Sequence, residues 1–145
     1  MGFADLRDFI RHVDDLGELR RVDGADWNLE IGEITEVAAL SPGCPMVLFD
    51  NIKDHKPGYR VVTNLLHTER RLALSLGEPL DLKGVPLVRA WKERIEKFYR
   101  GPLQVETDDA PIRQNIRTGD DVDLLEFPSA KWHALDGGRY YAGSV

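Results

Sequence analysis

The sequence predicts an α+β fold in which helices and strands do not alternate strictly. Apolar residues recur at helical spacing in two early segments, whereas residues 46–52 (MVLFDNI) and 59–66 (YRVVTNLL) are short β-branched and aromatic runs typical of strands. The predicted order is two helices, two strands, two helices and then several short extended runs. This order favours an α+β domain with a small sheet over a doubly wound parallel sheet.

The first helix is predicted from one apolar stripe, whose members are Leu6, Phe9, Ile10, Val13 and Leu16. Asp5 is its expected N-cap, and Gly17 is expected to end it. A short extended piece follows at residues 18–23. We expect Asn28 to cap a second helix with an apolar stripe of Ile31, Ile34 and Ala38.

The remaining elements are predicted from runs bounded by glycine, proline and short polar residues. Residues 41–45 (SPGCP) are a breaker, and the polar residues 53–58 are expected to form a hairpin loop between the two strands. Further helices are predicted over residues 68–76, ended by Gly77, and over residues 89–99. After these, residues 102–106, 112–118 and 122–127 are expected to be extended.

Charge and composition exclude several classes of protein. The 145 residues carry a formal net charge of −6, which argues against a general nucleic-acid or anionic-membrane binder. Cys44 is the only cysteine, so no intramolecular disulfide can form, and we expect it to be a small, at least half-buried side chain in a loop. No apolar run approaches the ~20 residues of a membrane span, and we expect a cytoplasmic protein.

The residue spacing alone reveals no active site. His12, His55, His67 and His133 are scattered, and none has the spacing of a metal ligand pair. We expect His12 and His55 to be solvated and His133 to be structural. The acidic run at residues 119–123 lacks the pattern of a calcium-binding loop and is interpreted as a turn.

One anion-binding alternative stays open at this point. A helix that begins at Thr68 would direct free backbone N–H groups outward, with His67, Arg70 and Arg71 nearby. Such a helix start could hold a phosphate group. The competing interpretation is an ordinary solvated helix start.

Five stretches in the same order resemble UbiD-type decarboxylases. They are DLRDFIRHVDDLGELRRVD (5–23), LEIGEITEVA (29–38), VLFDNIKD (47–54), VVTNLLHTERRLALSLG (61–77) and GDDVDLLEFPSAKWHALDGGRYYAGSV (119–145). The last stretch is the most specific, because it contains Gly-Asp-Asp-Val-Asp-Leu, Trp-His and Asp-Gly-Gly-Arg-Tyr together. The resemblance spans nearly the whole chain.

The resemblance implies a carboxy-lyase that reversibly removes CO₂ from an aromatic, heteroaromatic or α,β-unsaturated acid. Such enzymes use prenylated FMN held with Mn²⁺ and K⁺, and they are usually oligomeric. It further implies that residues 1–108 form an N-terminal α+β domain. Residues 109–145 would then begin the split β-barrel that binds the flavin, with a strand opening at residues 139–145.

The resemblance places the catalytic and metal-binding residues of the family beyond Val145, so we assign no catalytic or metal role to any residue of this chain. The family often has a threonine near Gly143 that approaches the cofactor, which leaves Ser144 as the one cofactor-binding candidate. The chain alone is expected to be inactive, and its strand edge to pair with another copy or a partner chain. The alternative is a stand-alone scaffold subunit whose partner supplies the rest of the barrel.

Overall fold

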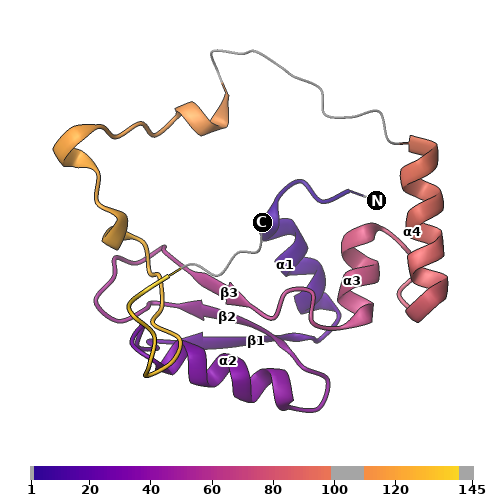
Figure 1. Ribbon diagram of the computed structural model, residues 1–145, viewed down its shortest axis with the longest axis horizontal. Coiled ribbons are helices and arrows are strands. Elements are labelled where there is room, and N and C mark those ends of the chain that lie inside the picture. Colours follow the sequence, from indigo (N-terminus) through magenta and orange to yellow (C-terminus); the bar gives the residue numbers. More distant parts are fainter. Residues whose placement is uncertain (1, 99–109, 141–145) are drawn as a thin grey trace.

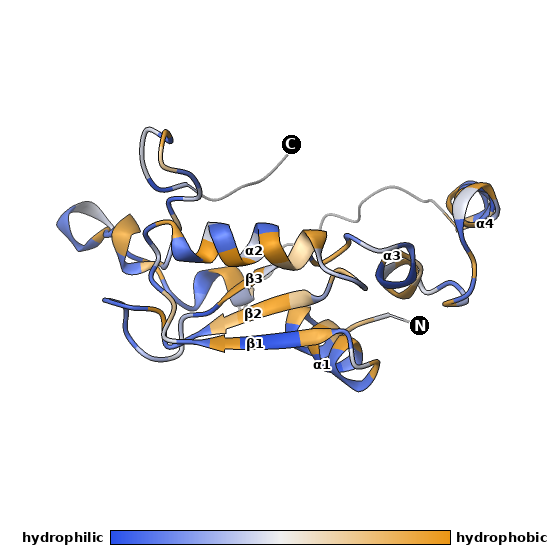
Figure 2. Cartoon of the chain, turned by 90° about the horizontal axis from the view of Figure 1, so that it is seen from below, coloured by the Kyte–Doolittle hydropathy of each residue, from blue (hydrophilic) through white to orange (hydrophobic). Residues whose placement is uncertain are grey.

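The structure is a computed structural model that describes residues 2–98 and 110–140 (Figure 1). A three-stranded sheet of order β1-β2-β3 forms its centre. Helix α2 (Glu30–Leu40) covers one face of this sheet and α1 (Leu6–Asp15) the other (Figure 2). The predicted small sheet in a mixed α/β domain is therefore confirmed.

The sheet is mixed, and its central strand is buried. Strand β1 (Leu19–Asp23) pairs in parallel with β2 (Met46–Asp50), and α2 provides the crossover between them. Strand β3 (Val61–Thr63) pairs with β2 in the antiparallel sense, as the predicted hairpin requires. Both predicted strands of the hairpin are longer in sequence than the strands observed.

Side chains of β2 alternate between two apolar clusters. Val47 and Phe49 pack beneath α2 with Ile31, whereas Met46 and Leu48 pack against α1 with Val13 on the opposite face. Because both faces are covered, β2 is apolar almost throughout and has the least exposed side chains of the sheet. This strand is the structural centre of the domain.

The ends of α1 agree with the prediction, whereas the start of α2 does not. The Asp5 side chain accepts a hydrogen bond from the Asp8 backbone N–H at 2.8 Å, so Asp5 is the N-cap of α1. Helix α2 begins two residues after Asn28, and its N-cap is Leu29, with φ of 76° and no side-chain cap. The backbone of Asn28 instead bridges to Lys131, a distant partner that no local cap rule includes.

Two helices follow the sheet. Helix α3 (Glu69–Leu76) has Thr68 as its N-cap, and Gly77 ends it with φ of 70°, as predicted. Helix α4 (Gly84–Phe98) begins earlier than the predicted residue 89. Its first turn tolerates Pro86, because N–H groups there have no partner within the helix. Arg94 joins the two helices through the carbonyl of Leu76 and the carboxylate of Glu78.

The extended runs predicted after α4 are not strands in the part that the structure describes. Residues 110–127, here called the arm, contain three single-turn 3₁₀ helices: Pro111–Arg113, Gly119–Asp121 and Leu124–Glu126. Their apolar residues have no sheet to join, and Ile112 and Leu124 are 88% and 73% exposed. Residues 102–106 of the prediction lie outside the described residues.

Other predictions can be compared directly. Cys44 is half-buried in the loop before β2, as predicted. Residues 139 and 140 are not in a strand, and the rest of the strand predicted at 139–145 lies outside the described residues. Among the described helices, none combines the length and apolar character needed to cross a membrane.

Candidate functional site

Residues 128–140, here called the docked segment, return to the N-terminal domain after the arm and lead toward the candidate Ser144 (Figure 1). Ser144 itself lies outside the described residues. The structure therefore defines the path that approaches the cofactor candidate, up to Tyr140. The docked segment is held by contacts with residues 27–36, which include the first half of α2.

Backbone groups of the docked segment pair with the chain just before α2. Leu29 donates its backbone N–H to the carbonyl of Lys131 at 2.9 Å, and Lys131 donates its own to the carbonyl of Trp27 at 3.0 Å. These bonds form the parallel bridge between Asn28 and Lys131. The left-handed backbone of Leu29 turns the chain from this bridge into α2.

Gly32 allows the docked segment to approach the helix closely. A Cβ at this position would lie 2.2 Å from the carbonyl oxygen of Trp132 and 2.9 Å from its Cα. Real Cβ atoms do not come this close to backbone, so any larger residue would push the docked segment away from α2. A glycine inside a helical stripe was the one signal in the sequence that pointed to this contact.

Two tryptophans hold the end of the docked segment. The Arg139 guanidinium lies 3.3 Å from the ring centroid of Trp27, a cation–π contact. The Trp132 indole N–H donates to the carbonyl of Tyr140 at 3.2 Å, and the Tyr140 N–H donates to the carbonyl of Ala130 at the same distance. Arg139 and Tyr140 are therefore fixed four or five residues before Ser144.

His133 adds a polar contact to α2. Its Nε2 lies 2.6 Å from a carboxylate oxygen of Glu36, and the Asp136 carboxylate accepts the His133 backbone N–H at 2.8 Å. The Glu36 carboxylate, by accepting this hydrogen bond, raises the pKa of His133 above its ordinary value. The structural role predicted for His133 is therefore observed.

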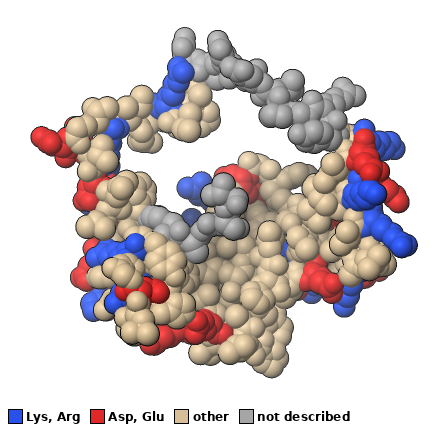
Figure 3. All heavy atoms as spheres, in the orientation of Figure 1, with Lys and Arg blue, Asp and Glu red and all other residues tan. Residues whose placement is uncertain are grey.

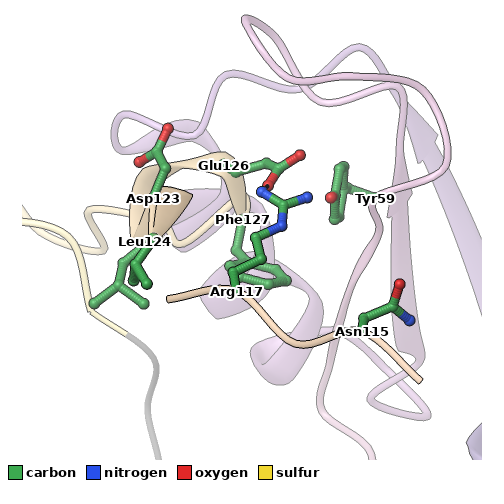
Figure 4. Close-up of a pocket in the computed structure, with 8 residues that line it drawn as sticks. Tyr59, Asn115, Arg117, Asp123, Leu124, Glu126 and Phe127 are labelled. Atoms are coloured by element: carbon green, nitrogen blue, oxygen red, sulfur yellow. Dashed lines mark hydrogen bonds and ion pairs between the residues drawn. The ribbon is translucent and has the colours of Figure 1, made fainter. Parts of the chain in front are cut away.

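A hollow lies where the arm meets the loop before β3 (Figure 4). This cavity of about 440 Å³ is lined by Tyr59, Asn115, Arg117, Val122, Asp123, Leu124, Glu126 and Phe127. Figure 4 shows Glu126 and Arg117 directed toward each other, with the Tyr59 ring beside them. The Tyr59 and Phe127 rings meet edge to face, with centroids 5.7 Å apart.

Glu126 is the anchor of this junction. Its carboxylate, 12% exposed, pairs with Arg117 and also accepts a hydrogen bond from Lys56 at 3.2 Å. Hydrogen bonds from Arg117 and then Lys56 lower the pKa of Glu126. A carboxylate held ionised by two cations is a structural tie between arm and domain rather than a general acid.

The anion-binding alternative at Thr68 is wrong. Arg71 is fully buried, and its guanidinium donates to the Glu18 carboxylate at 2.8 Å and to the backbone carbonyls of Cys44, Asn64 and Leu65. Arg70 pairs with the other oxygen of Glu18 at 2.9 Å. Both guanidinium groups are thus paired with protein groups. The Thr68 hydroxyl accepts a hydrogen bond from the Arg71 backbone N–H, one of the free donors of the helix start.

Residues 2–98 and 110–140 contain no group of three or more His, Cys, Asp or Glu side chains that could hold a metal ion. In the acidic run at residues 119–123, Gly119–Asp121 form a 3₁₀ turn, which agrees with the interpretation as a turn, although no strand follows it in the described residues. On the face shown in Figure 3, acidic and basic side chains are interspersed, and the central surface carries neither charge over most of its area. This face therefore offers no continuous basic patch.

Comparison with known proteins identifies the family. Residues 10–91 match the profile of the 3-octaprenyl-4-hydroxybenzoate carboxy-lyase N-terminal domain, UbiD_N. The chain belongs to the UbiD family. Within it, the pyrrole-2-carboxylic acid decarboxylase of Pseudomonas aeruginosa is 33% identical over 145 aligned positions, which cover 94% of this chain and 29% of that protein.

Solved UbiD-class structures share the fold. The closed form of Sedimentibacter hydroxybenzoicus vanillic acid decarboxylase matches with a TM-score of 0.82 and 30% identity over 96% of this chain and 29% of that one. An evolved dimeric HmfF from Pelotomaculum thermopropionicum, in complex with prenylated FMN, gives a TM-score of 0.69 and 26% identity over 92% of this chain and 29% of that one. The chain thus spans about three tenths of the length of these UbiD relatives.

Proposed function

We propose that this chain acts as the N-terminal portion of a UbiD-type decarboxylase whose substrate is an aromatic, heteroaromatic or α,β-unsaturated acid. The observation that carries the proposal is the structural match to vanillic acid decarboxylase, which extends over 96% of the chain and so beyond the N-terminal family profile. The curated relative that acts on pyrrole-2-carboxylic acid supports a decarboxylation reaction. We retain residues 1–108 and 109–145 as the proposed domain division.

The proposed cofactor is prenylated FMN with Mn²⁺ and K⁺. HmfF, solved with FMN and with prenylated FMN, supports a flavin. The described residues of this chain do not fit a site for the metal ion, because they bring no three metal-binding side chains together. We therefore propose that the remainder of the decarboxylase supplies those ligands and the catalytic residues, with Ser144 as the contact from this chain.

The role of the described residues in this proposal is orientation. When bound, prenylated FMN supplies an electron sink for the loss of CO₂. This chain contributes the sheet and α2 as a rigid base, against which the docked segment is held. Rigid elements of this kind position a site more precisely than a free loop does.

A scaffold subunit is the second candidate. The vanillic acid decarboxylase neighbour, ShVdcCD, has more than one subunit, and one of its structures holds a truncated ShVdcD. By analogy, the present chain would bind a partner that supplies the rest of the barrel. This reading predicts a stable complex with a separate chain rather than one long polypeptide.

The test begins with the DNA downstream of codon 145. If the frame continues, the full-length protein is loaded with prenylated FMN and Mn²⁺ and assayed for CO₂ release from pyrrole-2-carboxylate, vanillate and cinnamate. We expect flavin-dependent release from at least one of these acids. Flavin binding without CO₂ release from any acid of the three classes would contradict the proposed reaction, and a stop codon after Val145 would favour the scaffold subunit.

A further inference from the structure

We propose that the contact between residues 27–36 and the docked segment is a positioning device. In this role, Gly32 and Trp27 fix the point and direction at which the chain leaves the N-terminal domain toward the flavin-binding part. The inference rests on the proposed function, since it concerns where that function places its cofactor. Gly32 and Trp27 act here as positioning residues and not as catalytic ones.

The first argument is that the contact is made by backbone on backbone. The carbonyl of Trp132 lies where a Cβ of residue 32 would be, and the backbone of Lys131 pairs with Trp27 and Leu29. Backbone atoms cannot adjust as a flexible side chain would. The separation between α2 and the docked segment is therefore set closely, with little tolerance for a different register.

The second argument is that the contacts lie close to the exit of the segment. Ala130 joins the apolar cluster beneath α2, whereas residues 133–140, the described part beyond Trp132, belong to neither buried cluster. Arg139 and Tyr140 are nevertheless each held, one by the Trp27 ring and one by the Trp132 indole. These contacts add little to the hydrophobic core. Because they hold the last described residues of the docked segment, we infer that they set the direction in which the chain continues.

The third argument is the short distance that remains. Ser144 follows Tyr140 by four positions in the sequence, and four residue steps of extended chain reach at most about 14 Å. The position of Tyr140 therefore limits the region of space that Ser144 can reach. An error of about 1 Å at a reacting group is enough to impair catalysis, which gives a fixed exit its chemical purpose.

The experiment uses the full-length decarboxylase with the Gly32→Ala and Arg139→Met substitutions, each of which weakens the contact from a different side. Gly137→Ala is the matched control, because a Cβ there meets nothing within 4 Å and the residue lies in the same segment. Trp27→Phe is the conservative variant, since it keeps an aromatic face for Arg139. Hydrogen exchange at Lys131 reports docking, exchange at Phe49 in β2 reports the fold, and a flavin titration reports cofactor affinity.

We expect Gly32→Ala and Arg139→Met to lose protection at Lys131 and to bind prenylated FMN at least tenfold more weakly, with exchange at Phe49 unchanged. Gly137→Ala and Trp27→Phe should keep both protection and affinity. A variant that loses protection at Lys131 yet keeps its flavin affinity and kcat would overturn the positioning role alone. A wild-type protein that binds no flavin would overturn the proposed function and this role together.

Discussion

Strand β2 and the arm use the same types of residue in different ways. Strand β2 places Val47, Leu48 and Phe49 between two helices, and all three are buried. The arm also carries valine, isoleucine, leucine and phenylalanine, yet it folds into isolated 3₁₀ turns, and most of these apolar side chains are exposed. The difference teaches that a short apolar run becomes a strand only where a sheet edge and a covering helix are available.

The two regions also differ in how charged groups hold them. In the domain, Arg71 is buried and joins Glu18 to three backbone carbonyls from two loops, one before β2 and one after β3. In the arm, Glu126 is tied to Arg117 and to Lys56, whose side chains are largely exposed. Buried networks resist disruption because a lost partner leaves an unpaired group in low dielectric, whereas exposed ties are screened by solvent.

The largest effect that would sharpen this comparison is expected at Arg71. Arg71→Met removes the cation and leaves one Glu18 oxygen and three backbone carbonyls without this donor, so we expect the free energy of unfolding to fall by about 3–5 kcal/mol. Arg70→Met is the matched control, since Arg70 pairs with the same carboxylate from a half-exposed position. Its loss should cost less than about 1 kcal/mol.

Urea denaturation of the three proteins provides the measurement. We expect the urea midpoint of Arg71→Met to lie well below that of Arg70→Met, with the same m-value for all three proteins. Equal destabilisation by both substitutions would mean that burial of the guanidinium adds nothing, and the comparison between domain and arm would then lose its physical basis.

A smaller effect is expected at the helix caps. Thr68 accepts a hydrogen bond from the Arg71 N–H at 3.2 Å, and Thr68→Ala should lower the free energy of unfolding by about 1 kcal/mol. Thr118 occupies the same position before the 3₁₀ turn at Gly119–Asp121, but its side chain makes no cap bond. Thermal unfolding of Thr118→Ala should therefore match that of the wild type, and a comparable loss at both positions would contradict the assignment.

The next effect, on susceptibility to proteolysis, is expected to be confined to the arm. Glu126→Gln keeps the shape of the side chain but removes the charge that pairs with Arg117 and Lys56. We expect faster proteolysis within residues 110–127 with no change in hydrogen exchange at β2. If exchange at β2 rises as well, arm and domain unfold as one unit and the distinction drawn between them fails.

Elements that rest on local rules could be predicted from the sequence. The cap at Asp5, the stop at Gly77 and the antiparallel pair of β2 with β3 each depend on neighbouring residues, and all three are observed. The start of α2 could not be predicted, because Asn28 is engaged by Lys131 from a hundred residues away. Tertiary contacts of this kind override a local capping preference.

The candidate site was predictable only in outline. The Trp132-His133 pair and Arg139 fall in the most specific family-like stretch, but their partners Trp27 and Glu36 lie in stretches that showed no chemistry of their own. The anion-binding alternative at Arg70 and Arg71 could not be decided from the sequence for a related reason. Sequence cannot reveal that Glu18 lies beside both guanidinium groups until the fold brings them together.

The smallest expected effect is a pH dependence of docking. The pKa of His133 is raised above its ordinary value of 6.5, chiefly by the hydrogen bond to Glu36, so docking favours the protonated imidazole. This stabilisation is fully present below about pH 6.5 and is lost as the pH rises through the raised pKa of the docked state. Protection at Lys131, corrected for intrinsic exchange, should therefore decline between pH 6 and pH 8.5 by a small factor, because both side chains are more than half exposed. Glu36→Gln should flatten the profile, whereas an unchanged slope in that variant would show that the His133–Glu36 pair is not the source of the pH dependence.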